Sequence, residues 1–463
     1  MERAELIALV RATGCAVEKD GVFLLGDGEV RAAREMRTSN IQHRTSNVEV
    51  LTEDLDPTLN AERLTLNAQV GGTGGVLGAK IENQNSKISS GWLGIATGGS
   101  SGGLKFARHD ERTLTAAVRG FCAHFQLERV NAVDVLPAYH VSGLMARVRC
   151  AETGGAHVAW DWKRLEAGER PLLTAAEGGW VISLVPTQLQ RLLASTEAVA
   201  WLRGFKIIFI GGGPVWPELA EAAARERLPM SLSYGMTETA AMVAALLPEE
   251  FLVGARSCGR ALPHVKIDLV GDVGRVPSPA IEDGMRGEGT PPTVKEEGLV
   301  RIAGGSVFRG YFFAENFPEV CHPLDDKRDW GDGAGSGGAG EERAFVTEDL
   351  GRFDERGHLY ILGRRDAVII TGGKKVQPAD VESALRASGE FADVAVIGVP
   401  DAEWGEVVVA CYPAGGRAPD LARAAAGLVG AMKPKRFVAI AEWPRNAQGK
   451  INRAELRRFL GAG

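Results

Sequence analysis

The sequence predicts an α/β protein with a large, layered N-terminal domain rich in parallel strands and a small α+β C-terminal domain. The chain has 463 residues, enough for two or more domains with a well-buried core in the larger one. Short apolar runs alternate with helical patterns between about residues 180 and 235, and a second series of helices and strands follows Gly363. Strand, loop, helix and strand in this order are typical of a largely parallel sheet.

The composition predicts a soluble cytoplasmic protein. Hydrophobic residues make up 45% of the chain and charged residues 24%, and the net charge of -6 argues against binding nucleic acid or an anionic membrane. The N-terminal segment lacks the apolar stretch of a signal peptide, and no stretch approaches the ~18 apolar residues of an integral membrane helix. Six single cysteines indicate neither a disulfide framework nor a zinc site. The oligomeric state, including a homodimer, stays open.

Individual elements can be assigned from residue 91 onward, and little can be assigned before it. Apolar residues at helical spacing predict a helix from Leu114 to Phe125, capped by Asp110. Val181 to Val185 is typical of a strand, and Pro186 suits the first turn of the next helix. We also expect a strand at Lys206 to Ile210 closed by three glycines, a helix from about Pro217 to Arg227, and a short strand near Leu232.

The C-terminal domain begins after a segment with almost nothing to bury. Asp329 to Glu342 contains GDGAGSGGAGEE and is predicted to be a mobile surface insertion. The expected C-terminal elements are a helix at Pro378 to Ala387, strands at Val394 to Val399 and Val407 to Tyr412, a helix at about Leu421 to Met432, a strand at Phe437 to Ile440, and a final helix.

The first chemical motif is the glycine-rich segment from Thr97 to Lys105, TGGSSGGLK, which follows an apolar run. Its glycines let backbone N–H groups turn toward an anion, its hydroxyls donate hydrogen bonds, and its lysine adds positive charge. These features favour a phosphate-binding loop. The lysine spacing does not fit a Walker A loop, and a flexible Ser/Gly linker is an equally good interpretation of the composition alone.

Three further motifs carry polar groups. In Ser233 to Thr239, an aromatic ring, hydroxyls and a carboxylate could stack on a base and bind Mg²⁺, although a strand-to-helix turn capped by Thr237 is the simpler alternative. Asp349, in Thr347-Glu348-Asp349, could accept hydrogen bonds from ribose hydroxyls or belong to a surface ion pair. From Asp420 onward the sequence contains nine Lys and Arg residues and three Asp and Glu residues, which suggests an anionic ligand or a solvated face.

Together, in this order and spacing, the motifs resemble the acyl-adenylate-forming enzymes, which include acyl-CoA synthetases, over roughly residues 91 to 460. Thr97 to Lys105 is similar to TSGSTGxPK, with departures at residues 98, 101 and 104, and Tyr234 to Glu238 matches YGxTE. Thr347 to Asp349 resembles TGD with Glu for Gly, and Gly363 to Asp366 matches GRxD. Lys450 matches the lysine of the terminal PxxxxGKxxR pattern.

The resemblance implies an AMP-forming ligase that uses ATP, Mg²⁺, coenzyme A and a small carboxylic acid. Tyr234 and Gly235 would bind adenine, and Asp349 and Arg364 would bind ribose. Glu238 would bind Mg²⁺, Thr237 would contact the α-phosphate, and Lys450 would bind the reacting carboxylate and α-phosphate. The residues implied for phosphate binding are Thr97, Gly99, Ser100, Ser101, Gly102 and Lys105.

A second step would bring coenzyme A to the acyl-adenylate. The resemblance implies domains at 1–363 and 367–463 joined by a hinge at 364–366, with Asp366 as the hinge residue of a mobile C-terminal domain. His140 would be a catalytic residue at the acyl pocket, with a hydrogen-bonded core histidine as the alternative. The acyl and CoA channel would be lined by Gly211, Gly212, Gly372 and Gly373.

The segments Leu136 to Leu144, Val185 to Leu189 and Ile370 to Gly373 are similar to the o-succinylbenzoate–CoA ligases of menaquinone and phylloquinone synthesis. The second carboxylate of such an acid needs a cation or several hydrogen-bond donors, and Arg147 and Arg149 are candidates, with solvated roles as alternatives. Rival functions are ligation of another acid, or of an aryl acid to a carrier-protein thiol, and a non-catalytic nucleotide-binding homologue. A P-loop NTPase is the weakest rival.

Overall fold

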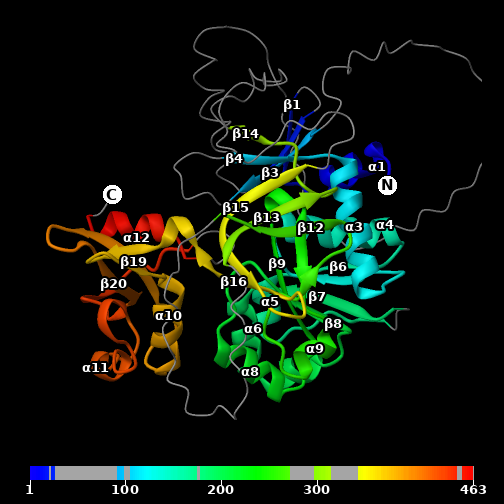
Figure 1. Cartoon of the computed structure of the whole chain (residues 1–463). Coiled ribbons are helices and arrows are strands. Elements are labelled where there is room, and N and C mark those ends of the chain that lie inside the picture. The colour runs from blue at the N-terminus through cyan, green and yellow to red at the C-terminus, as the bar shows by residue number, and fades with distance from the viewer. Residues whose placement is uncertain are drawn as a thin grey trace, which may run out of the picture.

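The computed structural model describes residues 1–19, 22–26, 91–97, 105–174, 178–271, 297–313, 343–445 and 451–461. The predicted insertion at Asp329 to Glu342 lies outside the described residues. Four sheets and the helices packed on them form a mixed α/β structure, which confirms the predicted fold class. In Figure 1 a smaller C-terminal unit, in orange and red, lies beside a larger body that contains the other three sheets.

The central sheet has seven strands in the order β11-β10-β9-β8-β7-β5-β6. Its β5 to β9 strands pair in parallel, as the alternation of strands and helices predicted, and β10 and β11 add an antiparallel edge. The strands are β5 (Asn131–Asp134), β6 (His157–Ala159), β7 (Trp180–Leu184), β8 (Ile207–Ile210), β9 (Met230–Met236), β10 (Ala241–Ala245) and β11 (Arg260–Ala261).

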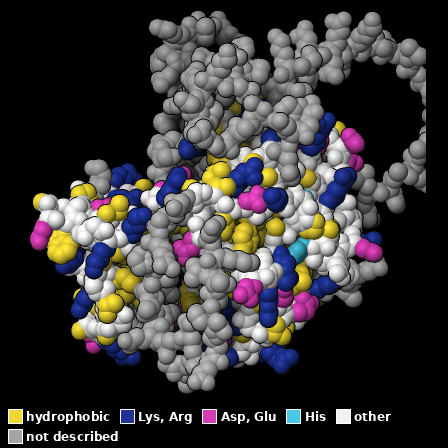
Figure 2. Space-filling view, in the orientation of Figure 1, with side chains coloured by type: hydrophobic (Ala, Val, Ile, Leu, Met, Phe, Trp, Pro, Cys, Tyr) yellow, Lys and Arg dark blue, Asp and Glu magenta, His cyan; other side chains and the backbone are white. Residues whose placement is uncertain are grey.

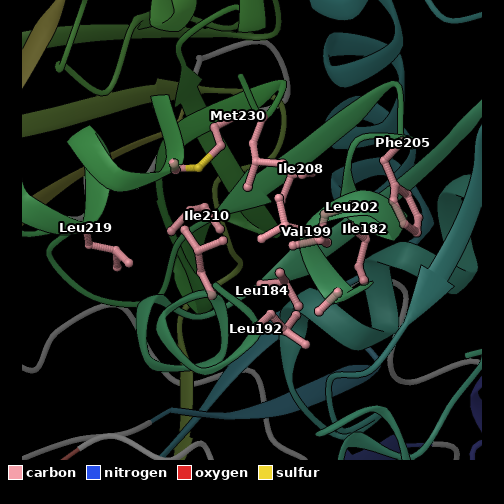
Figure 3. Packing of buried hydrophobic residues seen from close by; sticks show 14 of the residues in the cluster. Ile182, Leu184, Leu192, Val199, Leu202, Phe205, Ile208, Ile210, Leu219 and Met230 are labelled. Carbon is pink, nitrogen blue, oxygen red and sulfur yellow. The ribbon is translucent and has the colours of Figure 1, made fainter. Parts of the chain in front are cut away.

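Helices on both faces bury the central sheet. Its main cluster joins apolar side chains of β7 and β8 to those of the helices that follow, with Ile182, Ile208 and Leu202 almost fully buried (Figure 3). The helices of the large body are α1 (Arg3–Ala12), α3 (Glu111–Phe125), α4 (Val141–Thr153), α5 (Trp162–Glu166), α6 (Pro186–Leu192), α7 (Thr196–Leu202), α8 (Pro217–Arg225) and α9 (Pro248–Leu252).

The local signals read from the sequence explain several of these helices. Asp110 caps α3, because its side chain accepts from the backbone N–H of Thr113. Pro186 and Pro217 open α6 and α8 at positions where a missing N–H costs nothing. The helix α1 was not predicted, although Leu6 and Val10 recur at helical spacing and are fully buried.

The other two sheets of the large body are mainly antiparallel, so the expectation of parallel strands holds for the central sheet only. One has the order β1-β2-β3-β4-β14, with a single parallel pair, and the other has the order β12-β13-β15-β16. Their strands are β1 (Ala16–Lys19), β2 (Val22–Leu25), β3 (Leu93–Thr97), β4 (Lys105–His109), β14 (Tyr311–Phe313), β12 (Val265–Val270), β13 (Gly298–Gly304), β15 (Ala344–Phe353) and β16 (Leu359–Arg364).

The C-terminal unit is a five-stranded sheet with its own apolar clusters. It contains β17 (Ile369–Thr371), β18 (Lys374–Val376), α10 (Pro378–Ala387), β19 (Ala395–Asp401), β20 (Gly405–Pro413), α11 (Leu421–Ala424), β21 (Arg436–Ile440) and α12 (Arg453–Phe459). The prediction of one helix from Leu421 to Met432 is wrong. Only α11 and the 3-10 turn η4 (Gly430–Met432) form, because Gly427 weakens the helix and Gly430 has φ +55°.

Figure 2 shows dark blue Lys and Arg side chains at several places on the face of the C-terminal unit that is turned to the viewer. Among the described residues, no helix is long and apolar enough to cross a membrane.

Candidate active site

Three predicted nucleotide-binding residues meet where β9, β15 and β16 come together. The Tyr234 hydroxyl donates to Asp349 Oδ2 at 2.6 Å, and Arg364 Nη1 lies 3.5 Å from Asp349 Oδ1. Asp349 and Arg364 are register partners on adjacent strands, so the sheet itself places them side by side. Burial raises the pKa of the Asp349 carboxyl, against the opposing effects of the Tyr234 hydrogen bond and the Arg364 charge. The result is a buried acceptor with a cation beside it.

The turn after Tyr234 is shaped by close backbone approach. A Cβ at Gly235 would lie 2.0 Å from the Ala241 carbonyl oxygen, so only glycine lets β9 and β10 pair there. The chain then forms the 3-10 turn η1 (Thr237–Thr239) and enters β10. Thr239 fastens this turn, since its buried hydroxyl donates to the Ala241 carbonyl at 2.7 Å. The alternative of a strand-to-helix turn is therefore wrong.

Three residues from two other segments hold Thr237 and Glu238. His109 Nε2 lies 2.7 Å from the Thr237 carbonyl oxygen, Phe308 N donates to the Glu238 carbonyl at 2.9 Å, and the Tyr311 hydroxyl donates to Glu238 Oε1 at 2.8 Å. Burial lowers the pKa of His109 to about 4, so its imidazole is neutral at neutral pH and donates from Nε2 to the carbonyl. His109 and Tyr311 were missed by sequence reasoning, because their partners are distant in the chain.

The predicted phosphate loop connects β3 to β4. Thr97 and Lys105 are register partners on these antiparallel strands, and the Lys105 ammonium lies 5.6 Å from the centroid of the Tyr311 ring. The segment thus joins two strands of one sheet. The predicted residues Gly99, Ser100, Ser101 and Gly102 lie outside the described residues.

The predicted acyl-pocket residues lie at the ends of the central strands. His140 occupies the N-cap position of α4, half-buried, with its ring 4.4 Å from that of Tyr139. Gly211 follows β8 and lies close to the Ser233 hydroxyl, which a Cβ would approach to 3.0 Å. Gly212 has φ +79°, a conformation that suits glycine.

Arg149, a candidate raised by the sequence, is buried in α4 with its guanidinium 4.0 Å from the Phe121 ring centroid. Its Nε makes no hydrogen bond and no carboxylate pairs with it in the described part of the chain. It lines a small cavity with Ser183 and Phe209. Burial lowers its pKa to about 10, so the group stays charged at neutral pH. Arg147 differs, since its Nε lies 3.9 Å from Asp134.

The predicted channel glycines Gly372 and Gly373 form the turn between β17 and β18, both with positive φ. Gly372 N donates to the Trp404 carbonyl at 2.9 Å, and a Cβ at Gly372 would lie 2.7 Å from the Trp404 ring. This turn belongs to the C-terminal sheet and contacts β20, so the structure does not bring it to the Tyr234 cluster.

A surface depression of about 410 Å³ lies beside this turn, and its lining contains Trp404, the basic Lys435 and Arg436, and the acidic Asp401 and Glu403. The Lys435 ammonium lies 4.6 Å from the Trp404 ring centroid. The sequence indicated the basic character of this region but not the tryptophan, because an isolated aromatic residue carries no recognisable pattern.

The predicted hinge residue Asp366 lies in the 3-10 turn η3 (Arg365–Ala367). Arg364 forms a two-pronged ion pair with Asp366, at 2.8 and 2.6 Å, and Arg365 forms another with Glu348, at 2.8 and 2.7 Å. Glu348 stands where the resembled motif has glycine, so this departure adds an ion pair one residue before Asp366.

Lys450 lies outside the described residues, but both of its flanks are held to the C-terminal unit. Arg445 and Ile451 form a β-bridge, and Arg445 also pairs with Asp393. Arg453 Nη2 lies 2.6 Å from the buried Glu382 Oε1.

Two family models match the chain. Residues 30–312 match the model described as AMP-binding enzyme, and residues 380–450 match the AMP-binding enzyme C-terminal domain. A 2-succinylbenzoate–CoA ligase from Geobacillus kaustophilus is 30% identical over 72% of this chain and 62% of its own length. An indoleacetate–CoA ligase from Aromatoleum aromaticum is 30% identical over 79% of this chain and 66% of its own length. The chain thus spans less than two thirds of the length of these relatives.

Solved structures show the same likeness. The o-succinylbenzoate CoA synthetase from Bacillus subtilis in complex with its acyl-adenylate intermediate has a TM-score of 0.61 and 26% identity, over 80% of this chain and 69% of that chain. Another structure of that enzyme, with ATP and a magnesium ion, has a TM-score of 0.59 and 26% identity, over 80% of this chain and 70% of that chain.

Proposed function

Because the chain belongs to the AMP-binding enzyme family, we propose that it is an AMP-forming acid–CoA ligase. It would convert ATP, a carboxylic acid and coenzyme A to an acyl-CoA, AMP and pyrophosphate through an acyl-adenylate. The observation that carries this proposal is the meeting of Tyr234, Asp349 and Arg364, three predicted nucleotide-binding residues from separate strands.

The nucleotide would lie along the strand ends that carry these residues. The Tyr234 ring would stack on adenine, where Gly235 permits close approach, and Asp349 with Arg364 would bind the ribose hydroxyls. The β- and γ-phosphates would bind the loop between β3 and β4, through Thr97, Gly99, Ser100, Ser101, Gly102 and Lys105.

Glu238 fits a magnesium ion that arrives with ATP. The described residues contain no group of three or more His, Cys, Asp or Glu side chains able to hold a metal by themselves. Mg²⁺ commonly takes one or two carboxylates and completes its shell with water and substrate phosphates, so the single carboxylate of Glu238 is a sufficient protein ligand. When bound, the ion would neutralise phosphate charge near the reacting centre.

The first half-reaction joins two anions, so the protein must position them and offset their charge. A carboxylate oxygen of the acid would attack the α-phosphorus while the bond to pyrophosphate breaks. The Thr237 hydroxyl would contact the α-phosphate, and the Lys450 ammonium would hold the carboxylate and the α-phosphate oxygen.

The second half-reaction needs access for a thiol. We propose domains at 1–363 and 367–463 with a hinge at 364–366, so that rotation at Asp366 moves Lys450 away and brings Gly372 and Gly373 to the acyl-adenylate. His140 would gate the pocket, and Gly211 and Gly212 would line it. Lys435 and Arg436, in the lining of the depression beside Trp404, would bind phosphates of coenzyme A, next to the acidic Asp401 and Glu403 of the same lining.

We propose o-succinylbenzoate as the acid. No carboxylate among the described residues pairs with the buried guanidinium of Arg149, and burying a cation without an anionic partner is costly. The second carboxylate of the bound acid would be that partner. The alternative is another acid, as the name of the indoleacetate–CoA ligase relative indicates. Transfer to a carrier-protein thiol would involve the same first half-reaction.

The test is incubation of purified protein with Mg-ATP, coenzyme A and o-succinylbenzoate, with AMP and acyl-CoA detected by mass spectrometry. Both products are expected. Products with other acids only would keep the reaction class and reject the acid, whereas no AMP with any acid in a broad panel would favour a nucleotide-binding protein without ligase activity.

A further inference from the structure

Tyr311 contacts both of the charged side chains that are predicted to bind phosphate and metal. Its hydroxyl donates to Glu238 Oε1 at 2.8 Å, and its ring lies under the Lys105 ammonium, 5.6 Å from the centroid. The pairing of β14 with β4 fixes this position, because Tyr311 is opposite Ala107, two residues from Lys105. A strand far along the chain thereby joins the end of the phosphate loop to the turn after Tyr234.

The ring of Tyr311 is held by the same segment that holds Glu238. Phe308 packs against it edge to face, with 4.7 Å between the centroids, and the Phe308 backbone N–H donates to the Glu238 carbonyl. The phenol is the donor in its hydrogen bond to Glu238, because a carboxylate oxygen can only accept. No hydrogen bond from the described part of the chain reaches Glu238 Oε2.

We propose that Tyr311 is a positioning residue for the divalent cation. By holding Oε1, its hydroxyl fixes the carboxylate of Glu238 and leaves Oε2 as the oxygen for the Mg²⁺ that accompanies ATP. The inference rests on the proposed function, since it assumes that Glu238 is the metal-binding carboxylate. Tyr311 does not touch the reacting atoms in this proposal and acts through Glu238 alone.

The test measures metal binding without turnover. Mn²⁺ bound in the presence of α,β-methylene-ATP is followed by electron paramagnetic resonance in the full chain. Tyr311→Phe keeps the ring under Lys105 and removes only the hydroxyl, and the loss of a hydrogen bond to a charged group is expected to raise the Mn²⁺ dissociation constant roughly tenfold. The affinity for the nucleotide without metal, in EDTA, is expected to change less than about twofold.

Two variants keep the result interpretable. Tyr412→Phe removes a hydroxyl from β20 in the C-terminal unit and is expected to leave Mn²⁺ binding unchanged. In a Glu238→Gln background, Tyr311→Phe is expected to have no further effect, which a purely structural role would not predict. If Mn²⁺ affinity is unaltered or higher in Tyr311→Phe while Glu238→Gln measurably weakens it, this inference is overturned and the proposed function stands. If the wild type binds no Mn²⁺ with the nucleotide, the proposed function itself fails.

Discussion

Arg149 is the residue on which the proposed choice of acid depends. It carries a charge into the core of the large body with Phe121 beside it and no carboxylate paired to it among the described residues. Cation–π contact offsets only part of the cost of burying the charge. The second carboxylate of a bound dicarboxylic acid would offset the rest of this cost, whereas a monocarboxylic acid has no such group.

We predict that Arg149→Met raises KM for o-succinylbenzoate about 10- to 100-fold, because a charge-assisted hydrogen bond is lost. Turnover of a monocarboxylic acid and the urea midpoint are expected to stay unchanged, since a buried unpaired charge is replaced by an apolar side chain. Steady-state kinetics with both acids checks this. Arg147→Met, on the same helix but paired with Asp134, is the control, and an equal rise in KM from both variants would contradict the assignment.

For Lys450→Ala, the expected result is loss of adenylation by about 10²- to 10³-fold, because one contact that strengthens in the transition state is removed. Thioester formation from supplied acyl-adenylate is expected to persist. Pyrophosphate release and thioester formation, measured separately, check this. Equal losses in both half-reactions would exclude the two-step use of Lys450.

At the scale of elements, the turn between β17 and β18 joins a backbone conformation to a side-chain contact. Gly372 and Gly373 both need positive φ, but only Gly372 lies against the Trp404 ring. A side chain at Gly372 would therefore displace the tryptophan that borders the surface depression, whereas one at Gly373 would meet open space.

We predict that Gly372→Ala and Gly373→Ala each lose about 1 kcal/mol of stability from backbone strain. Gly372→Ala alone is expected to slow thioester formation, by about 10²-fold, through displacement of Trp404, while pyrophosphate release is kept. Rapid-quench assays of the two half-reactions measure this difference. Similar thioester rates in both variants would show that the tryptophan contact has no part in the second step.

The elements that the sequence predicted well are those with local signals. Pro378 to Ala387 forms α10 within the predicted bounds, and Asp110 caps α3 as expected. The helix after Leu421 was predicted too long because apolar periodicity outweighed two glycines. In the site, motif residues such as Tyr234 and Asp349 could be named in advance. Tyr311 and His109 could not, since strand pairing across more than 100 residues brings them to the turn.

At the scale of the whole molecule, residues 364 to 366 join the two units along the chain, and two ion pairs form at this proposed hinge, Arg364 with Asp366 and Arg365 with Glu348. The pair between Glu348 and Arg365 links the residue before Asp366 to β15. Each pair is exposed and contributes little to stability, which suits a connection that must rearrange.

We predict that Asp366→Pro keeps pyrophosphate release and blocks thioester formation, because proline fixes φ at the hinge and restricts the residue before it. Asp366→Asn, which weakens the pair with Arg364 but leaves the backbone able to rotate, is the matched control and is expected to support both half-reactions. Thioester formation by the proline variant at the wild-type rate would place the hinge elsewhere.

The stability of the molecule is expected to fall in mild acid. Burial lowers the pKa of His109 from 6.5 to about 4, so between these values the unfolded chain binds a proton that the folded protein does not. Above pH 6.5 the His109 contribution to the free energy of unfolding is fully present, and at pH 5 roughly 2 kcal/mol of it is lost. Urea unfolding at pH 7.5 and pH 5 measures the loss, and His109→Gln is expected to lose less. An identical loss in the variant would assign the effect to other groups.

The turn that carries Glu238 also bears on how such a chain can exchange parts with its relatives. His109 lies before the turn in the sequence, whereas Phe308 and Tyr311 lie some 70 residues beyond it, and all three hold it. A crossover between Glu238 and Phe308 would combine the turn of one parent sequence with the contacting residues of another. The turn and the residues that contact it must therefore come from the same parent sequence. We expect chimeras made by homologous recombination to stay functional mainly when the breakpoints fall outside residues 109–311.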